Sequence, residues 1–335
     1  MILIRADANE KTGSGHVMRC LSVASAFKAK GETVRFVTAD TKSYVLISSN
    51  GFDCEVLDTD FSDMEGEINK LTSIVSLYNP SLLIIDSYFV TECYFAELGK
   101  LVKTAYIDDL NEKVWDVDFL INYNVFASEY DYSGYENTKT KLLLTPEFAP
   151  LRDEFRNQAP HENKDNVTDI LVSAGGSDPA RISERIISEI CPLLPDIRFH
   201  FIIGALNPRI DEIKKMEKGN VVLHVNEQHI ADLMRECDIA VSASGSTLYE
   251  LCACGVPTIV YTLADNQIPA AKLFDKLGIM LNSGDCRFDE KFISNLKSCI
   301  RKLISDTDTR TKMSYNMQHL VDGQGAERLA ERLLS

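Results

Sequence analysis

The chain has 335 residues, which is enough for two domains of ordinary size, and 45% of its residues are hydrophobic. Its 50 acidic and 35 basic residues give a net charge of −15, which argues against a general affinity for nucleic acid or an anionic membrane, because both need a basic surface. A small anionic ligand stays open, since backbone amides at a helix N-terminus bind phosphate without net positive charge.

The nine cysteines are scattered and lie mostly in apolar segments, which is typical of reduced, buried residues in a cytoplasmic protein. Cys252 and Cys254 have no second pair near them, so no zinc site and no cofactor are predicted. No apolar run approaches the ~20 residues of a membrane-spanning helix, and no secretion signal is recognised at residue 1. We therefore expect a cytoplasmic protein whose partner is a small molecule, without nucleic acid or membrane; oligomeric state is not predicted.

In the first half of the chain, short β-branched runs alternate with helical patterns. Strands are expected at residues 2–4, 33–37, 81–86 and 103–108, the last two ending in acidic residues. A helix is expected at residues 16–30, with a glycine after it as its C-terminal stop. This alternation predicts a parallel sheet that is covered by helices on both faces.

The polar segment 156–167 is the best linker in the sequence, and the alternation restarts after it. Strands are expected at residues 168–173, 199–203, 239–242 and 257–261, with a helix at residues 179–190. The sequence thus predicts an α/β fold of two Rossmann-like, doubly wound domains, residues 1–156 and 157–335, that face a cleft. Ligands of such sheets bind beyond the carboxyl ends of the strands, so functional residues should follow the strands directly.

Three predicted strand-to-helix junctions are rich in small residues, and each leads into a helix whose first amides should be free. None is a Walker A loop or a complete dinucleotide fingerprint. Any one of them is equally well a tight turn, and in the second Asp178 reads as an N-cap with Pro179 at the first helical position. All three together favour a phosphate or diphosphate ligand held by Gly13, Gly15, Gly175, Gly176, Ser244, Gly245, Ser246 and Thr247.

His16 lies at the start of the first predicted helix, where the helix dipole disfavours a charged imidazolium. A neutral imidazole is what a general base needs, so we interpret His16 as catalytic, although a lone histidine is more often structural. Arg19, one turn later, either holds an anionic group or pairs with Asp7 across the loop.

Other polar residues follow strands of both predicted domains. Glu250 can accept both hydroxyls of a ribose or be a solvated helix residue, and Asn266 and Gln267 can bind sugar hydroxyls or form a plain turn. The acidic residues after two first-domain strands should face the cleft, but neighbours in sequence rarely point together, so a glycosidase pair or a metal site is not favoured. Their individual roles stay open: Asp86, Asp108 and Asp109.

The motifs of the chain, taken in order, resemble those of the UDP-2,4-diacetamido-2,4,6-trideoxy-β-L-altropyranose hydrolases of pseudaminic acid biosynthesis. The first is R-A-D at residues 5–7 followed by G-x-G-H-x-x-R-C-L at 13–21. The motifs at residues 242–250 and 265–267 are also loosely similar to those of the peptidoglycan UDP-N-acetylglucosamine transferase, so the whole set in its order carries the resemblance. The others are I-D-S-Y at 85–88, I-D-D at 107–109, N-Y-N at 122–124, P-L-R-D-E-F at 150–155, A-G-G-S-D at 174–178, S-A-S-G-S-T-L-Y-E at 242–250 and D-N-Q at 265–267.

The resemblance implies a glycosyltransferase-B-like fold used for hydrolysis without a metal. His16 would activate water for attack on the anomeric carbon and release UDP, and Tyr88, near the sugar, is counted as the second catalytic residue. The 244–247 loop would hold the diphosphate and Glu250 the uridine ribose, and Arg152 in the 150–155 motif is counted among the substrate-binding residues. The family fold also allows the last helix, residues 326–334, to pack back on the first domain. Apolar residues after D-N-Q depart from the pattern, which leaves the exact sugar open.

Three alternatives remain at this point. A glycosyltransferase of the same fold would replace water by an acceptor hydroxyl, although no Lys/Arg-rich amphipathic segment marks a membrane-facing acceptor site. A nucleotide-sugar-binding protein without hydrolysis would need no base at position 16. A nucleotide-sugar 2-epimerase would need several carboxylates around the sugar, and the sequence does not place them.

Overall fold

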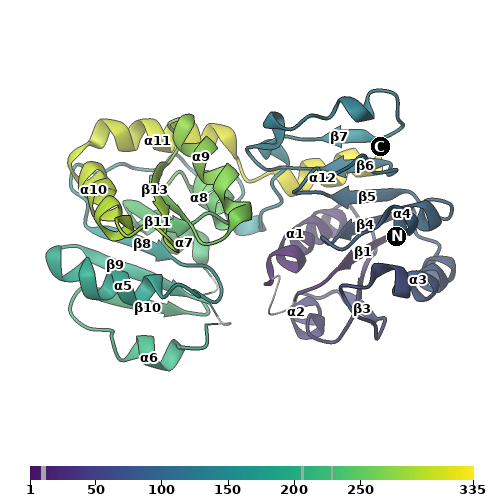
Figure 1. The fold of residues 1–335 in the computed structure, drawn as a ribbon, viewed down its shortest axis with the longest axis horizontal. Helices are drawn as coiled ribbons and strands as arrows, with labels where there is room; N and C mark the ends of the chain where they lie inside the picture. Colours follow the sequence, from purple (N-terminus) through teal and green to yellow (C-terminus); the bar gives the residue numbers. More distant parts are fainter. Residues whose placement is uncertain (9–12, 205–206, 228) are drawn as a thin grey trace. The chain divides into compact units, whose positions relative to one another are not determined.

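The computed structural model of the protein describes residues 1–8, 13–204, 207–227 and 229–335. Its internal contacts divide the chain into two compact units, one formed by residues 1–153 and 324–335 and the other by residues 154–323. Both units are drawn in Figure 1, and each has its own sheet and its own core.

The first unit is built on a fully parallel sheet, in which the described strands follow the order β3-β2-β1-β4-β5-β6-β7. The strand order reverses between β1 and β4, and in sheets of this kind ligands bind beyond the strand ends at such a reversal. The strands are β1 (Ile2–Ala6), β2 (Val34–Thr38), β3 (Asp53–Val56), β4 (Leu82–Asp86), β5 (Thr104–Ile107), β6 (Phe119–Ile121) and β7 (Lys141–Leu143).

Helices cover both faces of this sheet, because successive side chains of a buried strand point to opposite sides. On one face, Leu71 and Phe95 from two helices pack with Leu3 and Ile85 of the strands. The opposite face is covered by the first helix and by the last helix of the chain, which contact each other. The helices of this unit are α1 (Gly15–Ala29), α2 (Tyr44–Ser49), α3 (Met64–Tyr78), α4 (Glu92–Leu98) and α12 (Gly325–Leu334).

The second unit repeats this plan, with the described strands in the parallel order β10-β9-β8-β11-β12-β13. Here the order reverses between β8 and β11. The strands are β8 (Asp169–Ser173), β9 (Arg198–Ile203), β10 (Val221–Val225), β11 (Ile239–Ala243), β12 (Thr258–Thr262) and β13 (Leu281–Asp285). The helices are α5 (Ile182–Glu189), α6 (Ile210–Lys214), α7 (Ile230–Glu236), α8 (Thr247–Cys254), α9 (Ile268–Lys276), α10 (Phe292–Ser305) and α11 (Thr307–Leu320).

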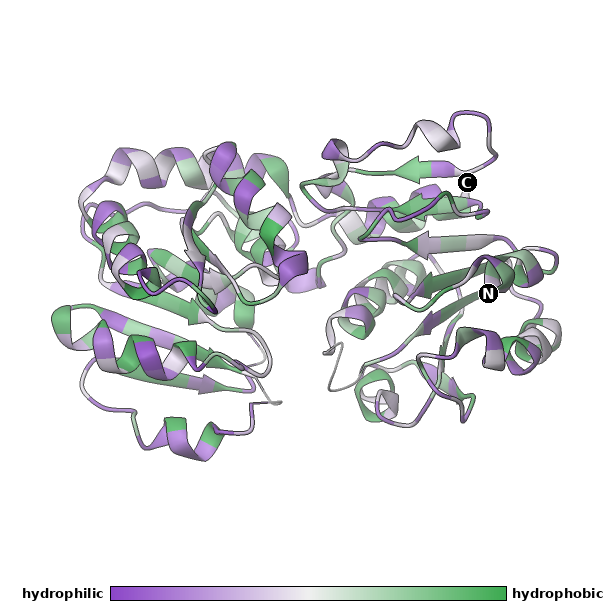
Figure 2. Cartoon of the chain, in the orientation of Figure 1, coloured by the Kyte–Doolittle hydropathy of each residue, from purple (hydrophilic) through white to green (hydrophobic). Residues whose placement is uncertain are grey.

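The core of the second unit contains β-branched and aromatic strand residues, such as Val241 and Phe199. Helices α5 and α10 close one face of the sheet through side chains such as Ile186 and Leu296. Figure 2 shows that both units have apolar residues on their strands, whereas the helices carry both polar and apolar residues. Burial of this apolar area is the main favourable term for folding.

The predicted fold class, two doubly wound α/β domains, is confirmed by the two sheets. Two details differ from the prediction. The second domain is predicted to run to residue 335, with its last helix allowed to pack back on the first domain; the contacts group residues 324–335 with the first unit, where α12 packs on α1. The helix expected at 179–190 begins only at Ile182, because residues 178 and 181 have positive φ angles that the helix cannot contain.

In the described part of the chain, no helix combines the length and the apolar character that a membrane span requires. All nine cysteines are free thiols, and most of them are buried.

Candidate active site

The candidate active site of the first unit lies at the carboxyl end of its sheet, where the strand order reverses. The register pairs Ala6 of β1 with Asp86 of β4, so the segments after both strands start side by side. Gly13 takes a φ of +73°, which suits glycine, in the turn before α1. His16 is the second residue of α1. The part of this loop at residues 9–12 lies outside the described residues.

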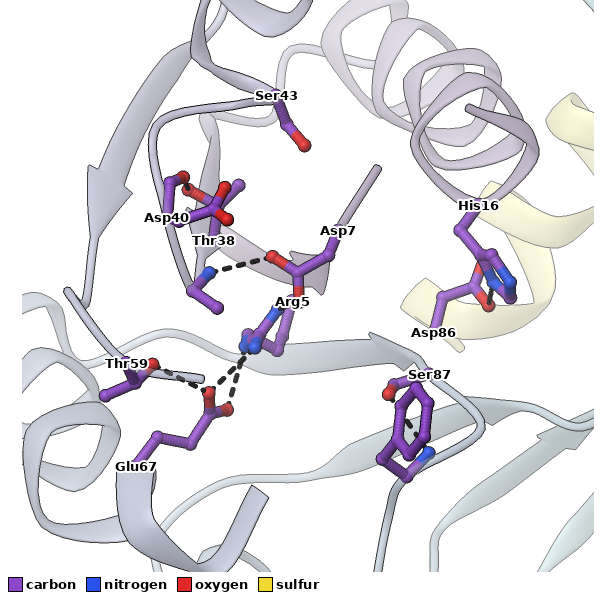
Figure 3. Close-up of polar contacts among 12 residues, drawn as sticks. Arg5, Asp7, His16, Thr38, Asp40, Ser43, Thr59, Glu67, Asp86 and Ser87 are labelled. Atoms are coloured by element: carbon purple, nitrogen blue, oxygen red, sulfur yellow. Dashed lines mark hydrogen bonds and ion pairs between the residues drawn. The ribbon is translucent and has the colours of Figure 1, made fainter. Parts of the chain in front are cut away.

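His16 and Asp86 form a buried pair. The His16 Nδ1 atom lies 2.5 Å from Asp86 Oδ1, and 7% of His16 and 1% of Asp86 are exposed. Because a carboxylate only accepts hydrogen bonds, the neutral ring carries its proton on Nδ1. No described residue forms a hydrogen bond with Nε2, which is therefore the basic nitrogen of the ring. Figure 3 shows the ring lying against Asp86.

Arg19 holds the carboxylate from its other side. Its Nε atom donates to Asp86 Oδ2 at 2.6 Å and its Nη2 atom donates to Asp86 Oδ1 at 2.6 Å. Burial alone would raise the pKa of Asp86, but the positive Arg19 and the His16 ring outweigh it, so the pKa lies well below its usual range. Asp86 is thus an ionised hydrogen-bond acceptor behind the histidine at neutral pH.

The second end of the Arg19 guanidinium reaches Asp109. Its Nη1 atom donates to the two carboxylate oxygens at 2.9 and 3.2 Å, and to the Tyr123 hydroxyl at 3.0 Å. Burial lowers the pKa of Arg19, but the two carboxylates more than offset it and hold the pKa well above its ordinary value. Of the two alternatives considered for Arg19, the pairing with Asp7 is not the one found, because Asp7 pairs with Arg5. The donors of Arg19 are committed within the protein and not aimed at a phosphate.

Tyr88 stands next to the histidine. The two rings meet edge to face, with centroids 4.7 Å apart and an interplanar angle of 80°. The Tyr88 hydroxyl donates to Asp109 Oδ2 at 2.9 Å. Burial and the negative Asp109 raise the pKa of Tyr88 far above its ordinary value, so the phenol keeps its proton. The structure therefore brings together the two residues that the sequence singles out as catalytic.

A small pocket opens beside this pair, and it is lined by aromatic and acidic side chains. Phe61 and Phe89 form one wall, with ring centroids 5.5 Å apart. Asp7 contributes a carboxylate that accepts from the Ala39 amide at 2.8 Å. Among the residues that the structure describes, the lining consists of Asp7, His16, Phe61, Asp86, Ser87, Tyr88 and Phe89.

Behind the pocket, a buried ion pair fixes the end of β1. The Arg5 guanidinium donates to both oxygens of Glu67 at 2.8 and 2.7 Å, and neither residue is exposed. The Tyr94 hydroxyl donates to the same carboxylate at 2.8 Å. Arg5 also contacts Asp7, as Figure 3 shows. Because two carboxylates surround Arg5, this guanidinium is likewise unavailable to an anionic ligand.

Asp108 has a different task from its neighbour. Its carboxylate accepts from the amides of Leu110 and Asn111 at 2.9 and 3.1 Å and from Trp115 Nε1 at 3.2 Å. Burial raises its pKa above the ordinary value. Asp108 therefore closes the turn after β5. It takes no part in the histidine cluster, by which we mean His16, Arg19, Asp86 and Asp109.

The third small-residue junction, in the second unit, leads into a helix N-terminus without a side-chain cap. α8 begins at Thr247 after Ser246, whose side chain makes no capping hydrogen bond. Gly245 and Ser246 are exposed, and a Cβ added at Gly245 would meet no atom within 4 Å. Ser244 is buried and donates from its hydroxyl to the Gln267 carbonyl at 3.0 Å. Free amides at such a position suit an anionic group.

The second junction differs from its prediction, because its helix N-terminus is already occupied. The two oxygens of Asp178 accept from the amides of Ile182 and Ser183 at 2.8 and 2.9 Å. Asp178 is therefore the cap, but it acts across a turn and Pro179 is not a helical residue. Gly176 lies against Gly204, since a Cβ added at Gly204 would meet the Gly176 carbonyl oxygen at 2.6 Å. Gly176 thus packs against the end of β9, whereas Gly175 is exposed and a Cβ added there would meet no atom within 4 Å.

The remaining predicted residues are spread over separate loops. Glu250 lies in the first turn of α8 and is partly exposed. Gln267 folds back, since its Oε1 atom accepts from the Leu263 amide at 2.8 Å, whereas Asn266 is exposed. Arg152 is half-buried just before residue 153. Across the residues that the structure describes, no three His, Cys, Asp or Glu side chains are grouped so that they could hold a metal ion.

A model of the glycosyltransferase family 28 C-terminal domain matches residues 170–333. Curated relatives cover more of the chain at low identity. A UDP-2,4-diacetamido-2,4,6-trideoxy-beta-L-altropyranose hydrolase of Campylobacter jejuni is 26% identical over 74% of this chain and 86% of its own length. The spore coat polysaccharide biosynthesis protein SpsG of Bacillus subtilis is 25% identical over 97% of this chain and 95% of its own length.

An uncharacterised protein of Methanocaldococcus jannaschii is 24% identical over 77% of this chain, which spans only 55% of that relative. Among solved structures, MurG of Acinetobacter baumannii aligns over 99% of this chain and 98% of its own, with a TM-score of 0.69 at 13% identity. At that identity the likeness concerns the fold alone, and it agrees with the glycosyltransferase-B fold that the sequence motifs imply.

Proposed function

We propose that the protein hydrolyses a UDP-linked 2,4-diacetamido-2,4,6-trideoxy sugar to the free sugar and UDP, as a step of pseudaminic acid biosynthesis. The observation that carries this proposal is the His16–Asp86 pair, in which one ring nitrogen is held by a carboxylate and the other is the basic one. The Campylobacter relative, whose name states this hydrolysis, supports the choice of substrate.

In the proposed reaction, His16 Nε2 takes a proton from water as the water oxygen bonds to the anomeric carbon. The bond between that carbon and the diphosphate oxygen breaks, and its electron pair leaves with UDP. The proton then passes from the imidazolium to solvent. Asp86 holds the tautomer that this step needs and stabilises the imidazolium, as the acid does in other carboxylate–histidine pairs. Tyr88, which lines the pocket, contacts the sugar.

The UDP part of the substrate is assigned to the second unit. The N-terminus of α8, at residues 244–247, has no side-chain cap and suits the diphosphate, because the helix dipole stabilises negative charge as it develops on the leaving group. Glu250, one turn along, suits the ribose hydroxyls. The family model that matches residues 170–333 supports this assignment. The proposed function needs no cofactor.

The test is UDP release from UDP-2,4-diacetamido-2,4,6-trideoxy-β-L-altropyranose without any acceptor, for the wild type, His16→Asn and His319→Asn. His319 is exposed on α11 and serves as the matched control. We expect release by the wild type and by His319→Asn, and a loss of about 10³-fold for His16→Asn with UDP binding retained. Equal release by His16→Asn and the wild type would overturn the role of His16.

A second candidate function is glycosyl transfer from the same UDP-sugar. It is favoured by the match to a glycosyltransferase domain over residues 170–333. A transferase binds the UDP-sugar, but it breaks the bond between the sugar and UDP only slowly until an acceptor hydroxyl is supplied. No UDP release from the sugar nucleotide alone, together with release on adding an acceptor, would decide for this candidate.

A further inference from the structure

The histidine cluster contains one more carboxylate than its guanidinium can balance. Arg19 lies between Asp86 and Asp109 and donates to both. With His16 neutral, the two carboxylates and the guanidinium sum to one negative charge. When His16 gains a proton, the sum becomes zero. The cluster is therefore electrically balanced when the imidazolium forms during the proposed reaction.

Asp109 is held more firmly than a surface carboxylate. Its oxygens accept from Arg19 Nη1, from the Tyr88 hydroxyl at 2.9 Å and from Asn124 Nδ2 at 2.8 Å. Only 13% of its side chain is exposed. Asp109 accepts from these side-chain donors, whereas Asp108 accepts from the backbone amides of its turn. Asp109 contacts Tyr88 directly, and it is connected to His16 through Arg19 and Asp86.

We propose that Asp109 is a positioning residue for the hydrolysis, which supplies the counter-charge for protonated His16 and fixes Tyr88 against the imidazole ring. This inference rests on the proposed function. It also assigns the Tyr88 proton, because the hydroxyl donates to Asp109 and so presents its oxygen, and not its proton, to the substrate. Tyr88 then acts through its ring and its acceptor oxygen and does not protonate the leaving group.

Other charged and titratable groups around His16 are paired differently. Asp7 lines the same pocket and is bound by Arg5. Cys20 on α1 donates to Asp86 at 3.6 Å, and burial raises its pKa well above the ordinary value. Burial likewise raises the pKa of Tyr123 to about 12, so it stays neutral. Removal of Asp109 therefore changes the balance of the cluster by one full charge.

The experiment compares Asp109→Asn, Tyr88→Phe and the control Asp116→Asn with the wild type. Asp116 lies in the same unit and its side chain is 79% exposed. Its substitution by Asn removes the same net charge as Asp109→Asn. Two quantities are measured: the kcat/KM of UDP release against pH, and the titration midpoint of the His16 ring by NMR, which needs no activity. Circular dichroism checks that each variant is folded.

For Asp109→Asn, we expect the ring midpoint and the acid limb of the kcat/KM profile to move down by about one pH unit, since an opposite charge is lost. The plateau should fall about 10-fold because the imidazolium is less stabilised. Tyr88→Phe keeps the ring contact and should lower the plateau less than 10-fold, and Asp116→Asn should match the wild type. An unmoved ring midpoint in folded Asp109→Asn would overturn the inference.

A loss of ~10³-fold or more in Tyr88→Phe would also overturn it, because that is the range of a lost proton donor. If the wild type released no UDP at all, the proposed function would fail. The NMR titration would still decide whether Asp109 sets the charge of the cluster.

Discussion

Replacing Asp86 by Asn tests the centre of the site, because it keeps the size of the side chain and removes its charge. The carboxylate accepts from His16 Nδ1, Arg19 Nε and Arg19 Nη2, all within 2.6 Å. An amide has one oxygen and one NH₂ group. Whichever way it is turned, its NH₂ group faces a donor, either the histidine or the arginine. The variant therefore loses at least one charge-assisted hydrogen bond and cannot hold the Nδ1–H tautomer reliably.

The expected effect on stability is large. Breaking a buried ion pair by removing one partner costs about 3–5 kcal/mol. Asp109 still pairs with Arg19 in the variant, so the guanidinium is not left alone and we expect about 3 kcal/mol. The expected effect on kcat/KM is a loss of ~10³-fold, which corresponds to about 4 kcal/mol of transition-state stabilisation.

The assay measures UDP release at saturating and limiting substrate, with urea unfolding of the same samples. Asp108→Asn is the matched control, since it changes a buried carboxylate at the neighbouring strand end that contacts backbone amides and not the histidine. It should lose about 1–2 kcal/mol of stability and keep kcat/KM within ~10-fold. A folded Asp86→Asn variant with kcat/KM within ~10-fold of the wild type would refute the reasoning.

The same pair gives stability a defined dependence on pH. The folded-state pKa of Asp86 lies below its ordinary value of 3.8, mainly because Arg19 offsets the effect of burial. A depressed carboxyl pKa contributes stability above the unfolded-state value, and the contribution is lost as pH falls through the folded-state value. The difference in unfolding free energy between the wild type and Asp86→Asn should therefore be full at pH ~7 and shrink below pH ~4.

Three further substitutions test the packing within the two units by urea unfolding. Gly323→Ala should cost about 2 kcal/mol or more, because φ is +78° and the new methyl group would overlap the Phe155 carbonyl oxygen; an unchanged midpoint would contradict this contact. Asp178→Ala should cost about 1–2 kcal/mol, since it removes the acceptor for two amides of α5. Glu67→Gln should cost about 3 kcal/mol by leaving Arg5 with a single carboxylate, and a loss below ~1 kcal/mol would argue that the pair is dispensable.

Much of the fold can be predicted from the sequence, because buried parallel strands are short apolar runs separated by helical periods. The strand expected at residues 81–86 is found at Leu82–Asp86, and the helix expected at 16–30 at Gly15–Ala29. Gly31, the expected stop, has a φ of +85°. The start of α5 could not be predicted, because Asp-Pro is an N-cap signal whose register depends on the φ angle of Arg181.

The site is predicted in part. A histidine at the start of a helix after the first strand is visible in the sequence, but its partner lies 70 residues away. The position of Asp86 follows from the strand order, since the first and fourth strands are neighbours at the reversal. The role of Asp109 does not follow, because it depends on the direction in which the Arg19 side chain leaves α1. Phe61 and Phe89, which form the pocket wall, carry no sequence signal beyond their apolar character.

The two small-residue junctions of the second unit show when such a motif offers an anion site. Both follow a buried strand and precede a helix, yet at α8 the N-cap side chain of Ser246 does not bind the first helix amides. At α5 the carboxylate of Asp178 already occupies them, so a phosphate would have to displace a buried negative charge. The distinguishing feature is an acidic residue within the junction itself. In this chain, the junction that contains an acid is therefore a capped helix start, and the junction that contains Ser-Thr is the candidate anion site, because its helix has no side-chain cap.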